Sequence, residues 1–274
     1  MSKKLLHAGE PFQSIHREAT NNALSKVPWE ALQRHGLPRL RLEEVANAWS
    51  QRVQTEFRSV QVMTRFMAEV VGAGDPIEVH SAAASAITHE VRRMGLCAAV
   101  VEALGFTPLL PEPLVETEPP GFLALPMAQR ALGTAVSMLC VSETLSVALI
   151  EDLRARCRHP ALAMVFALTL EAEDTHRDFG WAYVEASLAR FASDGARTFA
   201  RTVAEVALEP HIRQSMDVLA AVKGPRAELM ARLAEPHEAE WGLLSREREA
   251  ALKLEVIERV VMPRLLALGI APSI

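Results

Sequence analysis

The chain has 274 residues, of which 50% are apolar and 23% are charged, with a formal net charge of −5 at pH 7. This composition excludes an intrinsically disordered chain, and the length is sufficient to bury a sizeable core. No basic face with interleaved aromatic residues is present, so we expect no nucleic-acid partner. The apolar residues are mostly Ala, Leu and Val, and no regular run of short strands occurs, which favours an all-helical fold.

The sequence also predicts a cytoplasmic protein. Cys97, Cys140 and Cys157 are odd in number and widely spaced, which is typical of reduced thiols rather than of a disulfide framework. The apolar part of the first residues is too short for a signal peptide. No run of about 18 uninterrupted apolar residues occurs, so we expect no membrane span.

In chain order, the first expected element is a lead-in over residues 1–41 with one short helix near Pro28. A periodic segment from about 42 to 71 predicts the first long helix, which ends at the glycines that follow. Asp75 and Pro76 then mark a helix start, with Asp75 as the cap and Pro76 at the first helical position. This second helix should end near residue 104.

Residues 105–126 are rich in proline, which predicts an extended connection without regular structure. A third helix is expected over about 127–157 and a fourth from Pro160 to about Phe191. Two tight hairpins joined by one long crossover predict a four-helix bundle over residues 42–192. Residues 193–274 predict two or three more helices that pack on the bundle, and prolines punctuate them at positions 210, 225, 236 and 263.

Each of the four long helices carries one glutamate where the helical period demands an apolar residue. An ionised carboxylate on such a face costs several kcal/mol unless it is compensated. Bound cations are the simplest compensation for several such acids. The acids concerned are Glu56, Glu90, Glu143 and Glu173.

The spacing of these acids strengthens the metal hypothesis. Glu56 precedes Glu90, and Glu143 precedes Glu173, by about the length of one helical hairpin, which indicates an internal duplication. His176 lies one helical turn beyond Glu173 on the same face, so both side chains can reach one ion. The predicted metal ligands are therefore the four glutamates and His176.

This ordered set resembles the ferritin-like dimetal-carboxylate superfamily, which includes rubrerythrin-like proteins, ribonucleotide reductase small subunits and arylamine N-oxygenases. That family places Glu, Glu-x-x-His, Glu and Glu-x-x-His on four consecutive bundle helices. The resemblance covers about residues 42–192. It implies a ferritin-like four-helix bundle with one long crossover and additional C-terminal helices, which holds one or two ions of iron, or manganese, between its helices.

One position departs from the family pattern, because Arg93 stands where the first histidine is expected. Arginine stays protonated and cannot ligate a metal. His89 is next to Glu90 in sequence but points about 100° away around the helix, so it is a poor substitute. Charge counting then favours either a single-metal site around Glu143, Glu173 and His176 or a weakened second site.

Simpler interpretations of the same residues stay open. The glutamates could form a polar network that arginine neutralises, and Arg93 could instead face solvent. Tyr183 follows His176 by two turns and is either a redox or substrate contact or a core tyrosine. His89 either contacts a metal ligand without binding the ion itself, or lies at the surface.

The resemblance implies a metal-dependent oxidase or oxygenase that uses dioxygen to oxidise a small organic substrate. Glu143, Glu173 and His176 would hold one ion, and Glu56 and Glu90 would bridge to a second. The alternative hypothesis is a degenerate ferritin-like protein without redox activity that binds a ligand or partner, and Arg93 is its main support. The prediction includes no membrane partner and is compatible with a homodimer.

Overall fold

The computed structural model describes residues 12–33, 36–108, 121–171, 173–191, 194–222, 239–270 and 272–273, apart from the side chains of residues 173–177 and 194. Every regular element within these residues is a helix, so the predicted all-helical class is confirmed. The lead-in holds two helices, α1 (Phe12–Ala19) and α2 (Trp29–Gln33), with a 3₁₀ turn at Ala23–Lys26 between them. Only one helix was expected there.

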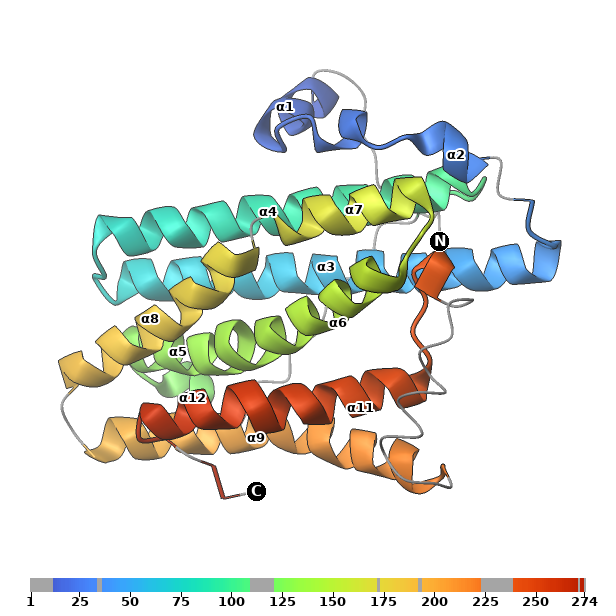
Figure 1. The fold of residues 1–274 in the computed structure, drawn as a ribbon. Coiled ribbons are helices and arrows are strands. Elements are labelled where there is room, and N and C mark those ends of the chain that lie inside the picture. Colours follow the sequence, from blue (N-terminus) through green and yellow to red (C-terminus); the bar gives the residue numbers. More distant parts are fainter. Residues whose placement is uncertain are drawn as a thin grey trace.

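The first two long helices, α3 (Arg39–Gly72) and α4 (Ile77–Ala103), form an antiparallel pair that lies side by side (Figure 1). The prediction that Asp75 caps α4 is wrong, because Pro76 precedes the helix without a side-chain cap. The Asp75 carboxylate instead accepts hydrogen bonds from the hydroxyl of Tyr183 at 2.8 Å and from Arg190 Nη1 at 2.6 Å. These bonds tie the turn between α3 and α4 to a later helix.

The third predicted helix is continuous but not uniform. It comprises α5 (Met127–Thr134), a π-helical segment (Ala135–Ser142) and α6 (Glu143–Arg156). The expected proline-rich connection before it falls mostly on residues 109–120, which lie outside the described residues. By length and composition this helix could cross a membrane, but 61% of its apolar stretch is buried inside the protein.

The fourth predicted helix is broken, contrary to expectation. It consists of α7 (Pro160–Leu170) and α8 (Glu173–Phe191), which run in different directions (Figure 1). The guanidinium of Arg92 on α4 donates to the carbonyl of Leu168 at 2.7 Å and lies 3.5 Å from the carboxylate of Glu171. A buried side chain thus satisfies a terminal carbonyl of α7, which stabilises the helix end at this position.

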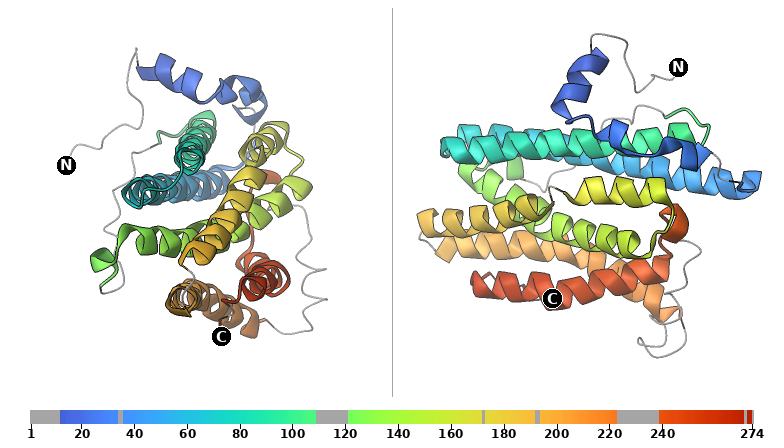
Figure 2. Two further views of the ribbon diagram at one scale, coloured as in Figure 1. Left: turned by 90° about the vertical axis from the view of Figure 1, so that its left-hand side faces the viewer. Right: turned by 45° about the horizontal axis from the view of Figure 1, so that its top comes forward.

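The C-terminal part adds a further layer, seen end-on in the left view of Figure 2. It contains α9 (Asp194–Ala220), a 3₁₀ turn (Ala239–Trp241), α11 (Arg246–Val256), a π-helical segment (Ile257–Val261) and α12 (Met262–Ala267). α9 packs on the π-helical segment 135–142, and α11 packs on α9 and α6.

The prolines in this part do not act as the sequence predicted. Pro210 lies inside α9, which continues through it. Pro263 falls at the start of α12, directly after the π-helical segment. A π turn accommodates the hydrogen bond that proline cannot donate, so this helix continues as well. Pro225 and Pro236 lie outside the described residues.

The buried apolar side chains form two clusters along the helices. One joins α3, α5 and α8 to α9 and α12, and includes Phe66, Leu139 and Val261. The other joins α3, α4 and α7 to the lead-in, and includes Trp49 and Phe166. The candidate site lies where polar side chains interrupt this apolar interior.

Candidate functional site: a buried arginine–carboxylate cluster beside a cavity

Three of the predicted metal ligands converge on Arg93. Its Nε lies 3.1 Å from Glu56 Oε2, and its Nη2 lies 3.7 Å from Glu143 Oε1. Nη2 also donates a short hydrogen bond to Glu90 Oε1. Glu56 comes from α3, Glu90 and Arg93 come from α4, and Glu143 is the first residue of α6. We call these four residues the arginine–carboxylate cluster.

Burial controls the protonation of this cluster. It raises the pKa of Glu90 and of Glu143 to about 7, although the nearby Arg93 acts in the opposite direction. Burial also raises the pKa of Glu56. Burial alone would lower the pKa of Arg93, but the three carboxylates outweigh it and the pKa is raised, so Arg93 stays charged.

Two carboxylate oxygens of the cluster lack a donor. Glu90 Oε2 and Glu143 Oε2 are buried and accept no hydrogen bond from the residues that the structure describes. Such oxygens need a proton, a water molecule or a cation. Glu90 lies within hydrogen-bonding reach of both other carboxyl groups, so a proton shared between neighbours supplies the missing donor near neutral pH.

The described side chains do not fit a pair of metal ions. Glu56, Glu90 and Glu143 surround a guanidinium, which takes the place that a cation bridging them would occupy. Like charges at this separation repel strongly in a buried site. Among the described residues, no group of three or more His, Cys, Asp or Glu side chains is arranged to hold a metal ion.

The other two predicted ligands are placed only through their backbone. Glu173 opens α8 immediately after the break that follows α7, and His176 lies one turn later in the same helix. Their side chains lie outside the described residues, so their place in the ligand set stays a prediction.

The two remaining predicted residues lie in different surroundings. His89 is half-buried on α4. Burial is the main cause that lowers its pKa, and the positive charges of Arg92 and Arg93 lower it further, so its imidazole is neutral at pH 7. Tyr183 is buried, packs edge-on against Phe66 and donates to Asp75. In this structure, Tyr183 holds α8 against the turn between α3 and α4.

A cavity of about 400 Å³ adjoins the cluster, and Glu56 belongs to both. Its walls come from α3, α6 and α7, and from the segment that leads into α11. Apolar side chains form much of the lining, with the polar residues Arg52, Thr55, Thr169 and Glu249 among them. Such a mixture is typical of sites that bind small organic molecules.

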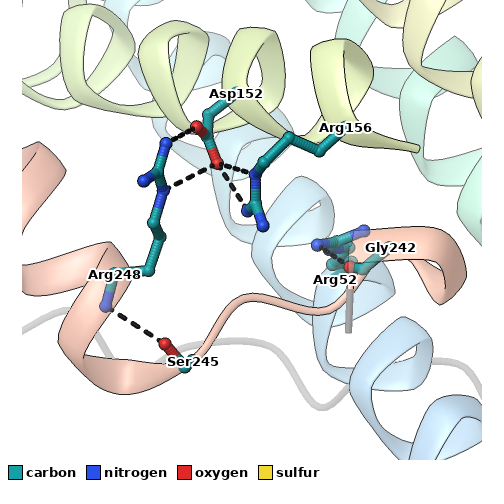
Figure 3. A network of polar contacts seen from close by, with 6 residues as sticks. All are labelled: Arg52, Asp152, Arg156, Gly242, Ser245 and Arg248. Atoms are coloured by element: carbon teal, nitrogen blue, oxygen red, sulfur yellow. Dashed lines mark hydrogen bonds and ion pairs between the residues drawn. The ribbon is translucent and has the colours of Figure 1, made fainter. Parts of the chain in front are cut away.

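Arg52 and residues 242–244 both line this cavity, and Figure 3 shows the Arg52 guanidinium at the carbonyl of Gly242. The guanidinium stacks 4.5 Å from the centre of the Trp49 ring, and its Nη2 donates to the carbonyl of Gly242 at 2.5 Å. The indole nitrogen of Trp49 donates to the carbonyl of Trp241 at 3.0 Å. These bonds join α3 to a segment about 190 positions later in the chain.

Sequence reasoning missed Arg52, Trp49 and Gly242 as cavity residues. A signal for Arg52 exists, because it lies one helical turn before Glu56 and beside the apolar face of α3. No local signal marks Gly242, whose role depends on contact with a distant helix.

Glu69 was also missed. It is completely buried and accepts a hydrogen bond from Thr134 at 2.7 Å, with Arg130 at 3.4 Å and Arg65 at 3.6 Å. Burial raises its pKa in spite of these partners. Its contacts connect α3 to α5, which is a structural role.

Comparison of the chain with protein-family models, with curated proteins and with solved structures gives no match, so the arrangement of its own residues carries the functional argument.

Proposed function

We propose that this chain is a ferritin-like helical-bundle protein in which Arg93 takes the place of a bridging metal, and which binds a small organic molecule in the cavity beside the arginine–carboxylate cluster. The observation that carries the proposal is the position of the Arg93 guanidinium between Glu56, Glu90 and Glu143. A guanidinium supplies fixed positive charge and directed donors, but it neither changes oxidation state nor binds dioxygen. The proposal therefore follows the degenerate alternative rather than a dimetal oxygenase.

The cavity supports the binding part of the proposal. It is next to the cluster, it is lined by α3, α6 and α7 together with residues 242–244, and it combines aromatic, aliphatic and polar walls. The side chain of Glu56 is 14% exposed and reaches from the cluster to the cavity, so the charge of the cluster acts on a molecule bound in the cavity.

A second candidate is a metal-dependent oxidase or oxygenase with a single ion held by Glu143, Glu173 and His176. The free oxygen Glu143 Oε2 favours it, because this atom has no donor among the described residues and is available to a cation. When bound, such an ion would supply redox or Lewis-acid chemistry.

Metal content separates the two candidates. Protein purified without chelator after growth with added iron or manganese should contain far less than one equivalent of either metal. One equivalent would support the second candidate, and two equivalents would overturn the interpretation of Arg93. The variant Arg93→His restores the family pattern and should raise the metal content above that of the parent.

Binding in the cavity is tested by a bulky substitution at an exposed residue of its lining. Thr55 is an exposed cavity residue on α3, and Thr64 is also exposed on the same helix but lies outside the cavity. In a fragment screen by ligand-observed NMR, compounds that bind the parent should lose binding to Thr55→Trp and keep it to Thr64→Trp. Equal binding to both variants, or no binding to the parent, would contradict the proposal.

A further inference from the structure

Arg52 is the charged group of the cavity that lacks a counter-ion. It forms no ion pair within the described part of the chain, and its Nη1 is buried without a hydrogen-bond acceptor there. Within the described residues, its one hydrogen bond joins Nη2 to the carbonyl of Gly242. Burial lowers the pKa of Arg52, which expresses the cost of holding this cation away from water. Buried charges in proteins are normally paired.

The acids near Arg52 already have other partners. Glu56 lies 3.1 Å from Arg93 Nε, and Glu249 forms an ion pair with Lys253 one turn along α11. Glu90 and Glu143 share Arg93 and have a pKa of about 7, so they are partly neutral near pH 7. The cavity wall therefore carries one guanidinium that Glu56 and Glu249 attract only from beyond ion-pair distance, and whose Nη1 has no acceptor among the described residues.

The rest of the wall suits an apolar body. Trp49 and Phe166 lie with their ring centres 5.6 Å apart, and Arg52 is close to both rings. Leu149, Ile150 and Leu244 continue the apolar lining. A molecule with one anionic end and an aromatic or aliphatic body matches this distribution of charge and surface.

We propose that the cavity binds small apolar carboxylates, with the ligand carboxylate paired to Arg52 and its apolar body packed along Trp49, Phe166 and the neighbouring aliphatic side chains. This inference rests on the proposed function and specifies its ligand class. Nη1 is covered in the present conformation, so binding includes a small shift of the guanidinium. The ligand carboxylate then supplies the acceptor and the negative charge that Arg52 lacks.

The test compares each acid with its uncharged amide. Octanoate and phenylpropanoate, and the corresponding primary amides, are titrated into the full-length protein at neutral pH by isothermal calorimetry. The acids should bind the parent at least about tenfold more tightly than the amides, as expected for a charge-assisted hydrogen bond. Arg52→Gln should remove this preference, while Arg52→Lys, which keeps the charge, should retain part of it.

Arg58→Gln is the matched control, because Arg58 is exposed on the same helix and does not line the cavity. It should leave the preference for acids unchanged, and a melting curve for each variant verifies that it is folded. Equal affinity for acid and amide in the parent overturns the carboxylate inference but leaves cavity binding intact. Absence of binding by acids, amides and the fragment screen overturns the proposed function as well. Acid preference that survives Arg52→Gln overturns the assignment of Arg52.

Discussion

At the scale of single residues, the arginine–carboxylate cluster combines three acids with one permanent cation. With all three carboxylates ionised, the cluster would hold an excess of negative charge in a buried site. Burial is the main cause of the raised pKa of Glu90 and Glu143, and the neighbouring carboxylates raise it further against the opposing effect of Arg93. The cluster therefore responds to pH in the neutral range.

Glu143→Gln should stabilise the metal-free protein at about pH 8. The pKa of Glu143 is about 7 in the folded protein and lower in the unfolded chain, which has its ordinary value of 4.5. The folded state thus binds more protons between these values, and its stability falls as the pH rises through the window. Glutamine removes the charge, so we expect a gain on the order of 1–3 kcal/mol at about pH 8 and little change at about pH 5.

Chemical denaturation of parent and variant in the presence of a chelator measures this effect. Arg93 keeps Glu56 and Glu90 as partners after the substitution, so its charge is not stranded. Glu151→Gln, on the exposed side of the same helix, is the control and should change neither stability nor its pH dependence. A loss of several kcal/mol at high pH in Glu143→Gln would mean that Arg93 depends on this acid.

At the scale of the helices, the irregular positions lie next to the candidate site. The π-helical segment 135–142 ends directly before Glu143, and the break after α7 comes directly before Glu173. π-helical turns are frequent at functional sites, because they change the direction of the side chains that follow. Glu143 and Glu173 thus both follow an interruption of regular helix.

Close packing of α8 on the π-helical segment depends on Gly180. A Cβ atom at this position would overlap the Cβ of Leu139 and come within 3.1 Å of its backbone carbonyl carbon. Because backbone cannot yield as a flexible side chain does, Gly180→Ala should push the two helices apart and destabilise the protein by about 1–3 kcal/mol.

Thermal or chemical unfolding compares this variant with Gly95→Ala. Gly95 is also in the middle of a long helix, but the nearest atom to an added Cβ is the His16 imidazole nitrogen at 3.2 Å, which belongs to a side chain that can move. The gain in helix propensity should make Gly95→Ala nearly neutral. Equal losses in both variants would show that packing against Leu139 is not the cause.

The sequence predicts the positions of the first three long helices and of the three acids of the cluster because both depend on the helical period. Glu56, Glu90 and Glu143 stand on apolar stripes, and the structure brings them together. Whether the Arg93 side chain faces solvent or the carboxylates could not be predicted, since a small rotation of α4 about its axis decides between the two. The break between α7 and α8 depends on Arg92, which is distant in sequence and therefore invisible to local patterns.

At the scale of the whole molecule, the C-terminal helices complete the interior rather than standing apart from it. Ala200, Leu208, Val261 and Leu265 belong to the same buried cluster as Phe66 of α3. Gly242, Leu244 and Glu249 line the cavity opposite residues of α3 and α7. Small-molecule binding should therefore depend on how firmly α11 is held against α6.

Asp152 is the point at which α6 holds α11 (Figure 3). Its carboxylate accepts hydrogen bonds from Arg156 at 2.6 and 2.9 Å and from Arg248 on α11, one of them short. The Ser245 hydroxyl accepts a hydrogen bond from the Arg248 amide at 3.2 Å and so caps α11. All three charged side chains are at most 15% exposed, so this network is shielded from solvent more than a typical surface ion pair.

A double-mutant cycle on Asp152→Ala and Arg248→Ala should give a coupling energy of about 1–3 kcal/mol in unfolding experiments, because the pair is hydrogen-bonded and mostly buried. Asp152→Ala should cost more than Arg248→Ala, since it leaves two guanidinium groups facing each other without a shared acid.

Arg248→Ala should also weaken the binding of phenylpropanoate, because it loosens the wall that Gly242 and Leu244 provide. Arg259→Ala is the matched control, since Arg259 is 74% exposed and forms an ion pair with Glu255 one helical turn away. If Arg248→Ala and Arg259→Ala bind phenylpropanoate equally well, α11 contributes to the stability of the fold but not to the cavity.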